Sequence, residues 1–215
     1  MSGDLDAGHI LGLFEDLSAR LAARDQHAQL FVVGGAAMSL LYDGERSTRD
    51  VDAVFEPSQA VRVATREVAE AHGLDTDWLN DGVKGFLPGD DPASVVVFES
   101  EHLLVSAASP RYLLATKLFA ARAERDLGDA ARLFRAAGLA NERQAEELLA
   151  GHYGWDRLLP KHGYVIAEVV ARAARVPEEV RQPLIERLRV RAEQERGSLD
   201  AGRAAHLGRD ESLER

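Results

Sequence analysis

An apolar run that ends in two glycines is the feature that most constrains how this chain folds. Residues 29–33 are short, apolar and rich in strand-forming side chains, and Gly34 and Gly35 follow them directly. This pattern predicts a buried strand, a sharp break and then a short helix at residues 36–42. Free N–H groups at the start of a helix attract anions, and glycine lets an anion approach the backbone closely. Such turns are common, so this one alone is weak evidence for phosphate binding.

Two carboxylates follow on the next predicted strand, residues 49–55. Asp50 and Asp52 alternate there with apolar residues, so their side chains are expected on one face, with Cβ atoms about 6–7 Å apart. Two ionised carboxylates at that separation repel each other unless a cation lies between them. Oxygen ligands of this kind suit Mg²⁺ or Mn²⁺, whose coordination substrate phosphates complete. The alternative is a solvent-facing strand edge, which is the commoner meaning of an isolated D-x-D.

Apolar periodicity along the rest of the chain predicts an α+β protein. Helices are expected at 6–24 and 58–73, a turn-rich stretch at 74–93, and a hairpin of two strands at 94–98 and 103–107. The pattern is helical from residue 110 onward, with helices expected at 110–124, 127–137, 141–151, 161–174 and 177–196. We therefore predict a mixed-sheet core with its N-terminal helix at 1–109, a helical region at 110–196 that completes the site, and a polar, disordered tail at 197–215.

Charge and composition narrow the choice of partners. The 215 residues carry a net charge of −10, and residues 1–100 alone hold 18 acidic and 7 basic side chains. An acidic half repels nucleic acid unless cations neutralise it, because phosphate contacts dominate that affinity. The chain contains no cysteine, which excludes thiolate metal sites and thiol nucleophiles. No apolar run approaches the roughly 18 residues of a membrane span, so we expect a cytoplasmic protein without membrane contact.

The glycine and aspartate motifs together resemble the hG[G/S]…Dh[D/E]h signature of the polymerase-β-like nucleotidyltransferase superfamily. Fourteen residues separate Gly35 from Asp50, at or slightly beyond the long end of that pattern. More narrowly, the stretches VVGGAAMSLL, RSTRDVD, LLATKLFAAR and RDLGD, and the segment from Trp78 to Pro88, resemble the DUF6036 and AbiEii/MenT-type nucleotidyltransferases. The likeness covers roughly residues 28–138. It implies a small mixed nucleotidyltransferase sheet with flanking helices and a helical C-terminal half.

The resemblance implies roles for the residues of these motifs. Gly34 and Gly35 would hold the phosphates of a nucleoside triphosphate (NTP), and Asp50 and Asp52 would bind Mg²⁺ or Mn²⁺. Lys117 would offset triphosphate charge or stabilise the departing pyrophosphate. The alternative for Lys117 is a lysine that merely extends from an apolar helix.

Asp126 and Asp129 match the R-D-x-x-D element and are the further catalytic candidates. Asp126 also fits the N-cap of a helix at 127–137. On one continuous helix Lys117 and Asp126 would lie nearly opposite each other, so their convergence requires a break near residues 124–126. The sequence leaves open which aspartate faces the site.

Arg46, Thr48 and Arg49 match R-x-T-x-D, and they either contact phosphates or fix the turn. The superfamily usually carries a third carboxylate on a later strand, where it acts as the base. The strand at 94–98 has no acidic residue, so Glu99 and Glu101 are the nearest candidates.

The resemblance implies Mg²⁺-dependent transfer of a nucleoside monophosphate (NMP) from an NTP to an acceptor, which would be a tRNA 3′ end or a protein hydroxyl. Many members of the wider group are toxins, so a cognate antitoxin is a further expected partner. Two alternatives stay open. One is a nucleotide sensor without catalysis, and the other is transfer to a cationic small molecule such as an aminoglycoside, which the acidic half of the chain would attract.

Overall fold

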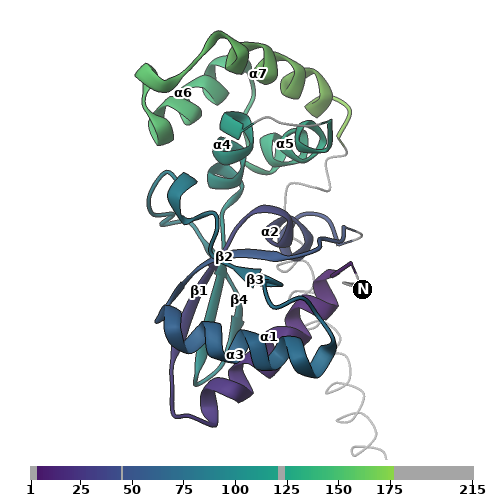
Figure 1. Cartoon of the computed structure of the whole chain (residues 1–215). Helices are drawn as coiled ribbons and strands as arrows, with labels where there is room; N and C mark the ends of the chain where they lie inside the picture. Colours follow the sequence, from purple (N-terminus) through teal and green to yellow (C-terminus); the bar gives the residue numbers. More distant parts are fainter. Residues whose placement is uncertain (1–3, 45, 121–123, 177–215) are drawn as a thin grey trace, which may run out of the picture.

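The computed structural model describes residues 4–44, 46–120 and 124–176. It confirms the α+β class, with a five-stranded mixed sheet and flanking helices (Figure 1). The strands are β1 (Ala28–Val32), β2 (Val51–Glu56), β3 (Leu79–Asn80), β4 (Val95–Glu99) and β5 (Leu103–Ala107). The helices are α1 (Ala7–Ala22), α2 (Gly34–Leu41), α3 (Ser58–His72), α4 (Pro110–Ala120), α5 (Glu124–Ala136), α6 (Glu142–Tyr153) and α7 (Pro160–Ala173), with 3₁₀ turns η1 (Lys84–Phe86) and η2 (Trp155–Arg157).

The strand order β3-β2-β1-β5-β4 decides which chain segments meet. β1 runs parallel to β5 and antiparallel to β2, and the predicted β4–β5 hairpin is confirmed. The C-terminal ends of β1 and β5 therefore lie at the same end of the sheet as the start of β2. Figure 1 shows helices α4–α7 grouped beyond that end. The glycine turn, the paired aspartates and the helical region are thus brought together.

Helices α1 and α3 cover one face of the sheet, as Figure 1 shows. Alternate residues of β1 and β2 point into this layer, so Leu30, Val32 and Ala53 are buried there. The helix expected at 6–24 is confirmed as α1, and its apolar side chains Ile10, Phe14, Leu17 and Leu21 form a fully buried stripe. Asp6 caps α1 by accepting a hydrogen bond from the His9 N–H at 2.9 Å.

The stretch at 74–93, expected to be turn-rich, contains the short strand β3 and the 3₁₀ turn η1. Trp78 is buried, and its indole N–H donates to the Thr65 carbonyl oxygen of α3 at 3.1 Å. This anchor fixes the chain immediately before β3, so that β3 pairs with β2 in parallel. A two-residue strand has no periodicity for sequence analysis to detect.

Element bounds differ from the predictions in two functionally relevant places. α2 begins at Gly34, so both glycines lie in its first turn rather than before it. α4 ends at Ala120 and α5 begins at Glu124, where one helix had been expected to reach residue 124.

The predicted helix at 177–196 and tail at 197–215 lie outside the described residues. Within the described ranges no helix has the length and apolar character needed to cross a membrane.

Replacing Trp78 by alanine is expected to lower the free energy of unfolding by about 3–5 kcal/mol, because a cavity replaces a fully buried indole. Trp155→Ala is the matched control, since that side chain is 65% exposed and its loss should change stability by about 0.5 kcal/mol or less. Urea unfolding of both variants measures the difference. Equal effects would show that Trp78 does not anchor β3.

Candidate functional site

Gly34 lies directly against the carboxylate of Asp52. Its φ of +61° is in the left-handed region that favours glycine, and a Cβ added there would lie 3.1 Å from Asp52 Oδ2. The strand pairing causes this approach, because the Val33 N–H donates to the Asp52 carbonyl oxygen at 2.9 Å. A side chain at position 34 would therefore press on the Asp52 carboxylate.

Gly35 packs against the turn that precedes β2. A Cβ added at Gly35 would lie 2.7 Å from Thr48 Oγ1 and 3.6 Å from Arg46 Nη2. The backbone of Thr48 is itself held in two hydrogen bonds with Leu5, at 2.7 and 2.9 Å. The structure thus places Thr48 where it fixes the turn, whereas Arg49 is exposed to solvent.

The two aspartates lie in different environments, contrary to the expectation that both sit on the strand. Asp50 precedes β2 and is exposed, while Asp52 is within β2 and half-buried. Burial raises the pKa of Asp52, repulsion from Asp50 raises it further, and a hydrogen bond from Asn80 lowers it. Among the described residues, no ion pair involves either carboxylate.

Asn80 is a site residue that the sequence analysis missed. It pairs directly with Asp52 in the β2–β3 register. Its Oδ1 accepts from the Gly82 N–H at 3.1 Å, which leaves its amide nitrogen as the donor toward Asp52. The only sequence signal was its place in the segment from Trp78 to Pro88.

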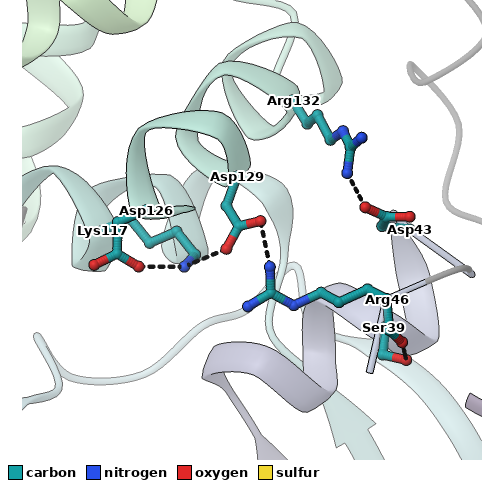
Figure 2. Close-up of polar contacts among 7 residues, drawn as sticks. All are labelled: Ser39, Asp43, Arg46, Lys117, Asp126, Asp129 and Arg132. Carbon is teal, nitrogen blue, oxygen red and sulfur yellow. Dashed lines mark hydrogen bonds and ion pairs between the residues drawn. The ribbon is translucent and has the colours of Figure 1, made fainter. Parts of the chain in front are cut away.

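A second group of charges lies beyond the sheet, centred on Lys117 (Figure 2). The Lys117 Nζ is 3.0 Å from Asp126 Oδ1 and 2.7 Å from Asp129 Oδ2. Lys117 lies on α4 and both aspartates lie on α5, so the packing of these two helices brings the three charges together. Asp126 is the third residue of α5, so the prediction that it caps the helix at 127–137 is wrong.

Both aspartates contact Lys117, but they differ in exposure. Asp129 is 4% exposed, and its other oxygen accepts a hydrogen bond from Arg46, whose side chain is 11% exposed. Asp126 is 30% exposed and lines, with Gly34 and Lys117, a pocket of about 550 Å³. Asp126 is therefore the aspartate that faces open space beside the glycine turn.

Two further contacts hold the turn after α2 in place, as Figure 2 shows. The Ser39 hydroxyl donates to the Arg46 carbonyl oxygen at 2.7 Å, and Arg132 of α5 pairs with Asp43. The side chain of Arg46 is thereby aimed across to α5.

Glu99 and Glu101, the candidates for a third carboxylate, lie away from the glycine turn. Glu99 pairs with Leu104 at the opposite end of the sheet, and Glu101 lines a separate pocket with His27. The antiparallel hairpin causes this, because it carries the end of β4 away from the glycine turn.

Asp129→Asn is expected to lower the free energy of unfolding by about 3–5 kcal/mol, because Arg46 and Lys117 would lose a buried counter-charge. Asp126→Asn, at a more exposed position, should cost about 1 kcal/mol or less. Denaturant unfolding of the two variants side by side measures this. A larger loss for Asp126→Asn would contradict the burial-based ranking.

A family model described as a nucleotidyltransferase of unknown function (DUF6036) matches residues 8–127, more than half of the chain. The matched stretch contains the glycine turn, Asp50, Asp52, Asn80, Lys117 and Asp126. No curated protein and no solved structure matches the chain. The chain thus belongs to the DUF6036 family of nucleotidyltransferases.

Proposed function

We propose that the protein transfers an NMP from an NTP to an acceptor hydroxyl. The observation that carries this proposal is the contact of Gly34 with Asp52, because Gly34 also lines the pocket that Lys117 and Asp126 line. In the reaction, the acceptor oxygen bonds to the α-phosphorus and the bond from that phosphorus to the bridging oxygen of the β-phosphate breaks. Pyrophosphate leaves with the electron pair, and the acceptor proton passes to a base.

Asp50 and Asp52 fit a Mg²⁺ or Mn²⁺ site that the substrate completes. Burial and the charge of Asp50 both raise the pKa of Asp52, and a divalent cation would relieve that cost. The described part of the chain contains no group of three or more His, Asp or Glu side chains that could hold a metal. Mg²⁺ commonly binds through one or two carboxylates plus substrate phosphates, so two suffice. The bound ion would neutralise charge on the phosphates during transfer.

The remaining roles follow from charge and exposure. Gly34 and Gly35 offer N–H groups of the first turn of α2 to the phosphates. We assign Lys117 to the charge of the leaving pyrophosphate. Asp126, the more exposed partner of Lys117, would take the acceptor proton, and buried Asp129 would hold Lys117 in position.

Three residues of the turn before β2 support the phosphate end of the site. We propose that Arg46 and Arg49 add positive charge near the phosphates and that Thr48 keeps the glycine turn in place. The contact between Gly35 and Thr48 supports the last of these roles.

We further propose that the acceptor is a tRNA 3′ end or a protein hydroxyl, and that the protein is the toxin of a toxin–antitoxin pair. This rests on the family resemblance. A nucleotide sensor without catalysis is the second candidate, because Glu99 and Glu101, the nearest candidates for a third carboxylate, lie at the far end of the sheet.

The deciding experiment incubates the protein with Mg²⁺, total tRNA and each of the four NTPs in turn, labelled at the α-phosphate. We expect label on RNA or on protein from at least one NTP, and its loss in an Asp50→Asn/Asp52→Asn variant. Bound NTP without any transferred label would overturn the proposed transfer to RNA or protein and favour the sensor.

Asp52→Asn should raise the melting temperature of the metal-free protein near neutral pH. The pKa of Asp52 is raised in the folded state, so the ionised carboxylate costs stability above that pKa, and this cost disappears below the pKa of the unfolded chain. Mg²⁺ should raise the melting temperature of the unmodified protein and not that of the variant.

Thermal unfolding with and without Mg²⁺ checks this behaviour. Asp77→Asn is the control, since Asp77 is an exposed aspartate in the turn before β3. A Mg²⁺-dependent shift that survives in Asp52→Asn would exclude Asp52 as a ligand.

A further inference from the structure

The pocket beside Gly34 carries an exposed aromatic ring that the reaction proposed above does not use. Phe86, in η1, is 72% exposed and lines this pocket of about 550 Å³. A single exposed apolar ring is common on protein surfaces. Phe86 is of interest because its ring lines a pocket, where a ligand can cover it.

The loop that carries Phe86 is held firmly at its backbone. The Tyr153 hydroxyl donates to the Phe86 carbonyl oxygen at 3.3 Å, and the Tyr112 hydroxyl donates to the Gly89 carbonyl oxygen at 2.8 Å. Burial raises the pKa of Tyr153 to about 12, so this hydroxyl stays protonated at neutral pH. The Phe86 ring is thus presented to solvent by an anchored backbone.

Another wall of the pocket combines aromatic rings with positive charge. Phe119 and Tyr153 stack with centroids 4.0 Å apart, and the Arg157 guanidinium lies 5.1 Å and 5.6 Å from these two centroids. Lys117, Lys161 and the carboxylate of Asp126 also line the pocket. Lys117 is already paired with Asp126 and with buried Asp129, so Arg157 and Lys161 are the described lining cations whose charge is left for a ligand. The pocket therefore favours an anionic ligand with an aromatic part.

We propose that this pocket binds the base and ribose of the NTP, with the base stacked on Phe86 and Arg157 donating to the base edge. This rests on the proposed function, which places the phosphates at Gly34, one of the residues that line the pocket. The volume lies in the range of small-molecule sites, and aromatic rings accept any base because every base has a π-face. The aromatic ring, the cations and the continuity with Gly34 fit one nucleotide laid along the pocket.

Calorimetric titration without an acceptor tests this, using each NTP and inorganic tripolyphosphate as separate ligands in Mg²⁺. Phe86→Ala should weaken NTP binding about tenfold, the typical loss of one base–aromatic stack, and leave tripolyphosphate binding unchanged. Tyr164→Ala is the matched control, since that ring is 79% exposed on α7 and does not line the pocket. Arg157→Ala should also weaken NTP binding selectively, with exposed Arg143→Ala on α6 as its control.

The outcomes separate this inference from the proposed function. If NTPs bind and are transferred but Phe86→Ala binds them as tightly as the unmodified protein, the base subsite is wrong and the transfer activity stands. An equal loss of NTP and tripolyphosphate affinity would also overturn the base subsite. If the unmodified protein binds no NTP, the proposed function fails and the subsite fails with it.

Discussion

Asp129 places a nearly buried carboxylate between two cations that come from different parts of the chain. Arg46 reaches it from the turn before β2 and Lys117 reaches it from α4. A buried charge is tolerated only with close counter-charges, so this arrangement ties the helices beyond the sheet to the turn that carries Thr48. Thr48 in turn packs on Gly35, and the neighbouring Gly34 packs on Asp52. The geometry of the site thus depends on this buried charge set.

The site divides into an acidic part and a cationic part. Asp50 and Asp52 have no ionic partner among the described residues, whereas Lys117, Arg157 and Lys161 line the adjoining pocket. In the proposed function, a nucleoside triphosphate with a divalent cation would suit both parts, because the cation would bind the carboxylates and the phosphates would contact the lysine. The excess of acidic residues in the first half of the chain therefore does not describe the local charge of the pocket.

Much of the fold follows from local pattern. The stripe on α1, the buried β1, the β4–β5 hairpin and the helices after residue 110 each have a periodicity that burial on one face imposes. The failures have one local and one tertiary cause. β3 has two residues and therefore no periodicity. Glu99 lies at the far end of the sheet because β5 pairs in parallel with β1, which places the β4–β5 turn beside the start of β1. Asn80 was missed because it lies in β3, which is too short to show a periodicity.

The sequence by itself determined the glycine turn and the alternation that buries Val51 and Ala53. It also singled out Asp50, Asp52 and Lys117 as candidate site residues. These features depend on neighbours a few positions apart in the chain. Only the tertiary structure decided that Asp50 lies outside the strand, that Asn80 faces Asp52, and that Asp126 is open while Asp129 is buried. These features depend on strand register and on the packing of α5, which join residues far apart in the chain and leave no trace in local spacing.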